Sequence, residues 1–300
     1  MSTSTGLMSF EEFLQLPDPP QGRLELHHGE VVQVPPVKFQ HTRIQKNIEK
    51  LLEAIDEETL LVSVSHVLFR SSFIQDLQAL TERAHQVGAL IVADVYQAAG
   101  TVPLNVKELN LDFATGGSVK WLCGGPGAGY LYVRPDLQAG LEPRATGWLA
   151  HKHPFDFVVG PTEYADDIYR FLNGSPNVPG MYAAMTGYEI INEIGVDKIR
   201  AKSIRQTTKL IELAEEAGFK INCPRNSAVR GGTVVVDVPN GQQVTKELLR
   251  RDFLVDFRPG AGIRMAPHFY TKDEELELMV REIKTILETK AYEQHSAAAH

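Results

Sequence analysis

The sequence is poor in cysteine, in long apolar runs and in basic residues. Only Cys123 and Cys223 occur among 300 residues, and neither has a cysteine or histidine partner at metal-ligand spacing. We therefore expect neither a disulfide framework nor a metal site. No apolar run reaches the roughly 18 residues that a membrane span needs, and residues 1–10 lack the pattern of a signal peptide. These absences predict a cytoplasmic protein without a membrane partner.

The charge balance narrows the range of partners further. Lys and Arg number 30 against 38 Asp and Glu, which gives a net charge of −8. Binding to nucleic acids or anionic membranes generally needs a basic surface that displaces counterions. We therefore expect no nucleic-acid partner, although this composition is compatible with a local basic pocket for a phosphate group.

The middle of the chain predicts alternating strands and helices. Residues 60–67 and 89–95 are short apolar runs typical of buried parallel strands, and residues 77–87 between them have helical spacing. Two further strands are predicted over 112–115 and 129–133. This alternation favours an α/β fold with a mostly parallel sheet that is covered by helices.

The C-terminal part predicts a small α+β domain, which follows a connection rich in proline and aromatic residues over 143–179. Its pattern predicts helices over 181–194, 196–217 and 245–253, strands over 219–222 and 232–238, and a last helix that Thr271 and Glu274 begin with a capping box.

The N-terminal part has a different pattern. Ser9 and Glu12 predict a capping box, residues 23–34 a hairpin, and residues 41–54 a helix. We divide the chain into four segments: an N-terminal fragment 1–56, a large-domain part 57–160, a small domain 161–292 and a disordered tail 293–300.

Asp94 ends an otherwise apolar predicted strand. A buried charge is costly unless a partner compensates it, and ligands of parallel sheets bind beyond the carboxyl ends of the strands. A carboxylate there could hold a protonated ring nitrogen, and Gln97 just beyond it could donate to a ring hydroxyl. The alternative is that Asp94 only caps the following turn, where aspartate is common.

Lys120 lies inside a glycine-rich, apolar segment, Gly116 to Gly127. A buried amine has a lowered pKa and is a competent nucleophile toward an aldehyde. The alternative is a surface lysine on a turn. No Gly-Lys-Ser/Thr run is present, so the segment does not match a phosphate-binding P-loop.

Several segments together resemble the class-V aminotransferase-fold enzymes, with the kynureninase branch closest, over about residues 57–290. The matching segments are Asp94 to Gln97, Val106 to Phe113, Ser118 to Lys120, Gly125 to Gly127, Gly147-Trp148, Phe171 to Asn177, Phe257 to Arg264, His268 to Tyr270 and Glu274. The resemblance implies an α/β fold consisting of a truncated fold-type-I large domain with a mostly parallel sheet and a C-terminal α+β small domain.

The resemblance also implies pyridoxal 5'-phosphate (PLP) as the cofactor. Lys120 would form the Schiff base with its aldehyde and shuttle the substrate α-proton, while Asp94 would pair with the ring nitrogen. Arg264 would bind the substrate carboxylate as a bidentate fork, with Arg258 as the alternative anchor. The other implied cofactor contacts are Gln97 at the ring hydroxyl, Ser65 and Ser118. Trp148 and Ser175 would lie at the phosphate, with Ser175 from the partner subunit of a homodimer; the alternative for Trp148 is a position in the core.

Two departures from the family pattern favour a second interpretation, in which the chain is a catalytically inactive module of the same fold. Val119 offers no polar contact beside the lysine. The sequence before Leu60 contains neither the Gly/Thr loop that holds the phosphate in this family nor its stacking aromatic ring. Loss of both would weaken cofactor binding.

Residues 9–52 instead resemble the start of the Uma2 family of restriction-endonuclease-like proteins. The matching segments are Phe10 to Leu16, Leu24 to Leu26, Gly29 to Val32 and His41. The Asp and Glu-x-Lys metal ligands of that family do not follow Leu52, so metal-dependent nuclease chemistry is not expected.

The leading hypothesis is a PLP-dependent lyase, hydrolase or transferase that acts on a small amino-acid substrate through Lys120. A second hypothesis is a catalytically inactive, truncated module of the same fold that serves in dimerisation or binding. A third is a remnant of a nuclease family.

Overall fold

The computed structural model describes residues 23–27, 30–34 and 50–295. The chain divides into two compact units, residues 1–43 and 44–300. In the first unit, β1 (Arg23–His27) and β2 (Glu30–Val34) pair antiparallel and confirm the predicted hairpin. The predicted capping box at Ser9 lies outside the described residues, as does the start of the helix predicted over 41–54.

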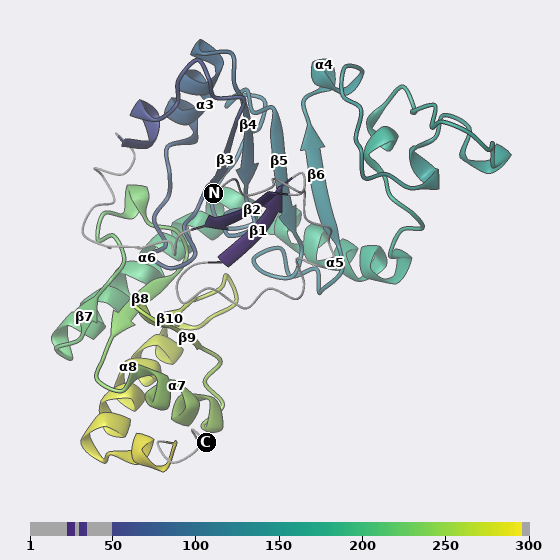
Figure 1. Ribbon diagram of the computed structural model, residues 1–300. Coiled ribbons are helices and arrows are strands. Elements are labelled where there is room, and N and C mark those ends of the chain that lie inside the picture. Colours follow the sequence, from purple (N-terminus) through teal and green to yellow (C-terminus); the bar gives the residue numbers. More distant parts are fainter. Residues whose placement is uncertain (1–22, 28–29, 35–49, 296–300) are drawn as a thin grey trace, which may run out of the picture. The chain divides into compact units, whose positions relative to one another are not determined.

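The second unit begins with a four-stranded sheet, which Figure 1 shows with its strands side by side. The strands are β3 (Leu61–Ser65), β4 (Leu90–Asp94), β5 (Phe113–Gly117) and β6 (Gly129–Val133), in the order β3-β4-β5-β6. The first three are parallel and β6 is antiparallel to β5. The prediction of a mostly parallel sheet is therefore confirmed.

Helix α3 (Leu77–Gln86) connects β3 to β4 and packs on the sheet. The helix begins at Asp76, whose carboxylate accepts the Ala79 N–H at 3.0 Å, and it is followed by Gly88, whose φ of +81° suits glycine. Leu80 of the helix and Ile91 of β4 are fully buried in the core that this crossover forms.

The connection after β6 contains four short helices: α4 (Pro135–Gln138), η2 (Trp148–Ala150), η3 (Pro154–Asp156) and η4 (Ile168–Phe171). Helices α5 (Val178–Ile194) and α6 (Val196–Glu216) follow and confirm the two helices predicted there. Asn177 caps α5 by accepting the Gly180 N–H at 3.3 Å. This cap starts α5 three residues earlier than the apolar spacing predicts.

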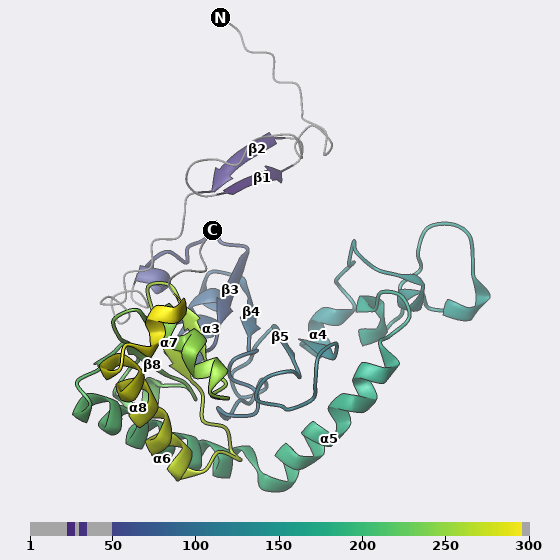
Figure 2. The same cartoon turned by 90° about the horizontal axis from the view of Figure 1, so that it is seen from below.

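A second sheet forms the C-terminal part. It contains β7 (Lys220–Ile221), β8 (Val234–Asp237), β9 (Asp256–Arg258) and β10 (Gly262–Met265), all antiparallel, in the order β7-β8-β10-β9. Helices α6, α7 (Gly241–Arg250) and α8 (Asp273–Glu288) gather around it, as Figure 2 shows. The short helix η5 (Ser227–Val229) precedes β8. The predicted α+β domain is present, with Val235 and Ile263 among its fully buried residues.

Two details of this part differ from the prediction. The capping pair of α8 is Lys272 and Glu275, one residue later than predicted, because the Thr271 hydroxyl accepts the His268 N–H at 2.9 Å instead. Residues 293–295, expected in the tail, belong to η6 (Ala291–His295), and the His295 ring contacts the Glu247 carboxylate at 2.9 Å. The proposed boundaries after residues 56, 160 and 292 stay predictions. No described helix is long and apolar enough to cross a membrane.

Candidate active site

The carboxyl ends of β4 and β5 bring Asp94 and Lys120 to the same edge of the first sheet. The two strands are parallel, with Asp94 paired to Thr115, and Lys120 lies three residues beyond the end of β5. The turn that carries Lys120 is closed by two backbone bonds: Cys123 N–H to Lys120 C=O at 3.0 Å, and Gly124 N–H to Ser118 C=O at 2.7 Å.

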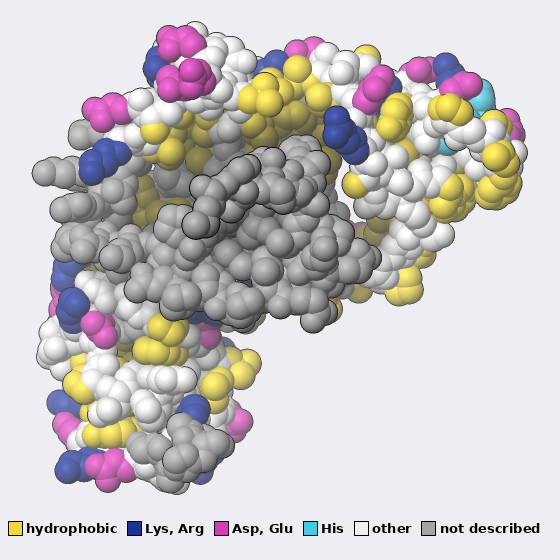
Figure 3. Space-filling view, viewed as in Figure 1, with side chains coloured by type: hydrophobic (Ala, Val, Ile, Leu, Met, Phe, Trp, Pro, Cys, Tyr) yellow, Lys and Arg dark blue, Asp and Glu magenta, His cyan; other side chains and the backbone are white. Residues whose placement is uncertain are grey.

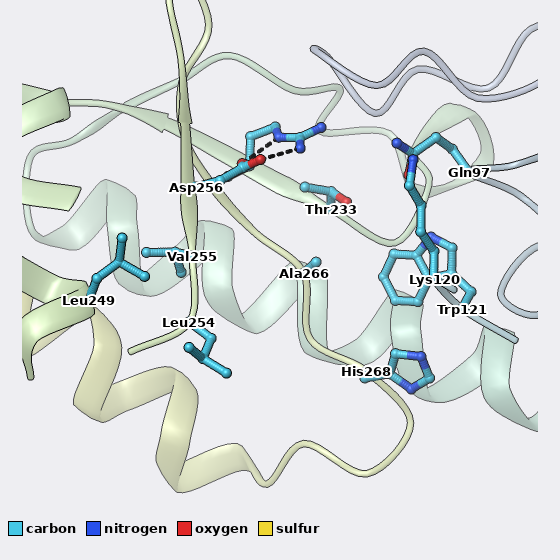
Figure 4. A pocket seen from close by; sticks show the side chains of 11 residues that line it. Gln97, Lys120, Trp121, Thr233, Leu249, Leu254, Val255, Asp256, Ala266 and His268 are labelled. Carbon is cyan, nitrogen blue, oxygen red and sulfur yellow. Dashed lines mark hydrogen bonds and ion pairs between the residues drawn. The ribbon is translucent and has the colours of Figure 1, made fainter. Parts of the chain in front are cut away.

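A cavity of about 420 Å³ opens beside Lys120. In Figure 4, Lys120, Gln97, Trp121 and His268 stand on one side of it, and Asp256, Leu249, Leu254 and Val255 stand on the other. Thr233, Arg264 and Ala266 complete the lining. The cavity therefore combines residues that follow the strands of the first sheet with residues of the second sheet, its loops and helix α7.

Lys120 is exposed, so the prediction of a buried lysine is wrong. The cavity wall nevertheless removes part of its water. This partial burial, and after it the positive charge of Arg264, lower the pKa of Lys120, while the Asp94 carboxylate acts in the opposite direction. The amine lies 4.5 Å from the centroid of the Tyr96 ring. The lysine thus has the lowered basicity expected of a nucleophile without being enclosed.

Asp94 is also exposed, which corrects the expectation of a buried carboxylate. Ile91 and Ala93 of the same strand point into the core, so the alternation of the strand does not turn Asp94 inward with them. Its Oδ1 accepts the Tyr96 N–H at 2.9 Å, as the turn-capping alternative requires, and its Oδ2 accepts the Ser65 hydroxyl at 3.3 Å. Ser65 and Asp94 are direct neighbours in the β3–β4 register.

Ser118 lies in the protein interior, away from the cavity lining. Its side chain is fully buried, its hydroxyl donates to the Ala128 carbonyl at 2.9 Å, and it also contacts the Tyr188 hydroxyl of α5. In this arrangement Ser118 holds the Lys120 turn against α5.

Trp148 and Ser175 are not brought to the Lys120 cavity. The Trp148 ring packs on Phe155 and Phe157, with centroids 5.5 Å and 5.9 Å away, and lines a separate cavity of about 240 Å³. Ser175 is exposed just before α5. Within the described part of a single chain, these two expected phosphate contacts therefore do not line the Lys120 cavity.

Arg264 is the better placed of the two candidate anchors. It lines the cavity and is only 15% exposed, whereas Arg258 is 46% exposed and does not line it. Both guanidinium groups pair with Asp256, through Arg264 Nε to Oδ1 at 2.6 Å and Arg258 Nη2 to Oδ2 at 2.8 Å.

His268 and Asp256 are site residues to which sequence reasoning assigned no role. The His268 ring stacks on Trp121 and Tyr270, with centroids 5.2 Å and 4.5 Å away, and burial lowers its pKa to about 4. The imidazole is therefore neutral at pH 7. The motif from His268 to Tyr270 was the available signal for the first residue. The signal for Asp256 lies in the β9–β10 pairing, which the sequence does not reveal.

Comparison with known proteins adds evidence of relationship. The model of the family described as aminotransferase class-V matches residues 22–257. The chain is 33% identical over 241 residues to the uncharacterized aminotransferase YcbU of Bacillus subtilis, covering 80% of this chain and 63% of that protein. It is 30% identical over 259 residues to the kynureninase of Pseudomonas fluorescens, covering 84% and 62%. The chain thus spans less than two thirds of the length of these relatives.

Solved structures show the same fold. A cysteine desulfurase of Thermococcus onnurineus NA1 superposes with a TM-score of 0.74 at 23% identity, covering 86% of this chain and 66% of that one. The class-V match begins at residue 22 and so includes much of the segment that resembles the Uma2 family. The Uma2 resemblance gains no support from these comparisons and stays a prediction.

Proposed function

This chain belongs to the class-V aminotransferase family, and on that premise we propose that it is a PLP-dependent enzyme that attaches the cofactor at Lys120 and acts on an amino acid. The observation that carries the proposal is the amine of lowered pKa at a cavity that Arg264 also lines. An aldehyde acceptor and a carboxylate anchor within one cavity suit an amino-acid substrate.

The residues at the cavity fit the ring end of PLP better than its phosphate end. Asp94 lies at the strand edge close enough for its charge to act on Lys120, and Gln97 lines the cavity with an amide that can donate to a ring hydroxyl. The phosphate contacts we propose, Trp148 and Ser175, lie outside it. We therefore propose that a homodimer completes the phosphate site, with Ser175 of the partner subunit contributing.

Bound PLP would supply an electron sink for the carbanion left when the substrate loses its α-proton. Lys120 would hold PLP through its amine and, once released, would hold the α-proton on its Nζ; a lowered pKa leaves more of the amine neutral and able to bond to an aldehyde. Asp94 would pair with the ring nitrogen of PLP, and the Ser65 hydroxyl donates to its Oδ2. Arg264 binds the substrate carboxylate and fixes its orientation.

We propose no particular bond cleavage after the loss of the α-proton, and therefore no particular branch of the family. Cys123 approaches the site, with its Sγ 3.5 Å from His268 Nε2. Partial burial raises the pKa of the Cys123 thiol, however, and the neutral imidazole supplies no positive charge to stabilise a thiolate. A cysteine nucleophile is therefore not part of the proposal.

The apolar face of α5 supports the homodimer. Val178, Met181, Tyr182 and Met185 recur at helical spacing, and all are exposed, Tyr182 by 70%. Phe155 and Phe157 of the preceding connection are exposed as well, and Figure 3 shows apolar side chains over that part of the surface. Such a surface is typical of a protein interface.

Reductive trapping tests the enzymatic proposal. The protein is incubated with PLP, treated with borohydride and digested, and the labelled peptide is identified by mass spectrometry. We expect the label on Lys120 and its loss in Lys120→Ala, whereas Lys107→Ala, which removes an exposed lysine elsewhere, keeps it. A label spread over surface lysines in the wild type would contradict the proposal.

The second candidate function is an inactive module for dimerisation or binding. The position of Trp148 and Ser175 outside the cavity and the exposed face of α5 favour it. A dimeric, colourless protein that takes up no PLP at saturating concentration would support this candidate against the enzyme.

A further inference from the structure

Three charged side chains project from one face of the β9–β10 hairpin. Asp256 lies directly opposite Arg264 in the antiparallel register, and Arg258 lies two residues further along β9. Side chains at positions i and i+2 of a strand share a face, as do directly opposite residues, so all three side chains meet. The Asp256 carboxylate joins the two guanidinium groups through bonds to Arg264 and Arg258, and dashed lines in Figure 4 mark bonds of Asp256.

Arg264 is held on two of its edges. Its Nε and Nη2 donate to the two oxygens of Asp256, and its Nη1 donates to the Phe69 carbonyl in the loop between β3 and α3. A guanidinium has five N–H bonds. The contacts among the described residues use three of them, which leaves one N–H on each terminal nitrogen. Two such bonds form the fork that binds a carboxylate bidentately.

Arg258 helps to keep the Asp256 carboxylate ionised. Burial alone would raise the pKa of Asp256, but Arg264 and then Arg258 outweigh burial and hold the pKa below its ordinary value. The carboxylate is therefore ionised at neutral pH. Arg258 also offsets the charge of Asp256, so the pair adds little net charge beside an incoming anion.

We propose that Asp256 is a positioning residue for substrate recognition, which fixes the Arg264 guanidinium so that its terminal N–H bonds are presented to a carboxylate in the cavity. This rests on the proposed function, because the substrate is taken to be an amino acid. Without Asp256, Arg264 must lose rotamer freedom when a ligand binds. The cost of immobilising one long side chain corresponds to a loss of roughly two- to twelvefold in affinity.

A pair of matched probes measures this effect on the full chain. Propionate carries a carboxylate, and propionamide has the same shape without the charge. Their dissociation constants are measured by NMR titration. The ratio of the propionamide constant to the propionate constant reports carboxylate recognition alone. We expect the ratio to fall roughly two- to twelvefold in Asp256→Ala with propionamide affinity unchanged. General damage to the fold would weaken both probes equally.

Charge effects are separated from positioning by a double variant. Asp256→Ala with Arg258→Gln removes a neutral pair, and positioning predicts the same loss of preference as in Asp256→Ala. Asp237→Ala removes an exposed carboxylate of the same sheet that pairs with Lys220, and it should leave the ratio unchanged. Tighter propionate binding in Asp256→Ala would show that Asp256 competes for the fork and would overturn the proposal, as would a wild type with no preference for propionate.

Failure of this proposal is distinguishable from failure of the cofactor proposal. Trapping at Lys120 is scored on the same preparations, with and without PLP. A missing label at Lys120 together with an Asp256-dependent ratio would reject the enzymatic function and keep the positioning role. A label at Lys120 with an unchanged ratio would do the opposite.

Discussion

Replacing Gly187 by alanine tests whether α5 holds the Lys120 turn in place. A Cβ at Gly187 would lie 2.3 Å from the Leu122 carbonyl oxygen and 2.7 Å from the carbonyl carbon and oxygen of Cys123. These atoms belong to the backbone of the turn, so no side-chain rotation relieves the contact. Ordinary contact begins at 3.4 Å. The turn must therefore retreat from α5 by about 1 Å, the order of misplacement that can impair catalysis.

Two opposing terms set the effect on stability. Alanine in a helix interior is favoured over glycine by about 1 kcal/mol. Overpacking a filled contact costs about 1–3 kcal/mol. The expected net change is a destabilisation of about 1 kcal/mol, which urea denaturation resolves. The effect on the site is larger, because a reacting group displaced by about 1 Å can lose as much as about 100-fold in rate.

The assay is the rate of borohydride-trapped PLP attachment at Lys120. Gly174→Ala is the matched control, since a Cβ at Gly174 meets no atom within 4 Å and its φ is not positive. We expect slower trapping in Gly187→Ala than in Gly174→Ala. Equal rates and equal stability would refute the conclusion that α5 positions the lysine.

Three further predictions follow from the charges and the surface. Glu247→Gln should lower the free energy of unfolding by about 2 kcal/mol, because the solvent-shielded carboxylate binds two arginines. The pKa of Glu247 is depressed in the folded state, so this stabilisation is present above the pKa of an unfolded glutamate and is lost as the pH falls through the folded-state pKa. The urea midpoint of the variant should therefore vary less with pH in acid than that of the wild type. The rate of PLP attachment at Lys120 should reach half its maximum at a pH below the ordinary pKa of lysine; a midpoint at the ordinary value would contradict the lowered basicity. Tyr182→Glu should shift the sedimentation coefficient of the proposed dimer toward that of a monomer, and Lys107→Glu, on an exposed site elsewhere, should not.

Much of the first sheet was predictable because its signals are local. Buried parallel strands require continuous apolar runs, and the runs over 60–67 and 89–95 contain β3 and β4. A parallel order then brings the carboxyl ends of β4 and β5 to one edge, where Asp94 lies close enough to act on the pKa of Lys120. The family resemblance added the assignment of roles, which strand patterns alone do not supply.

Side-chain burial near the site was less predictable. An apolar flank suggested that Lys120 and Asp94 are enclosed, but both follow or end a strand, where the chain leaves the core. Ser118, by contrast, was expected at the cofactor and is fully buried instead. Its hydroxyl donates to the Ala128 carbonyl and contacts the hydroxyl of Tyr188, which lies 70 residues further along the chain. Such long-range partners leave no periodic signal.

The pairing of β9 with β10 was also beyond the sequence signals. These strands are only three and four residues long, too short for a clear alternation of polar and apolar side chains. Their register alone places Asp256 opposite Arg264, where the carboxylate binds the guanidinium. A sequence motif can identify the arginine, but the residue that orients it becomes visible only through this register.

On the proposed function, the local charge of the cavity would link substrate binding to the basicity of Lys120. Burial and, after it, Arg264 and Arg258 lower the pKa of Lys120, while Asp94 and Asp256 act in the opposite direction, in a chain that is acidic as a whole. A carboxylate bound on Arg264 would offset the arginine that has the greater effect. The pKa of Lys120 would then rise, so that the amine, first nucleophilic in the empty cavity, would hold a proton more tightly once substrate is present. The same arginine would thus serve both to anchor the substrate and to prepare the lysine for proton transfer.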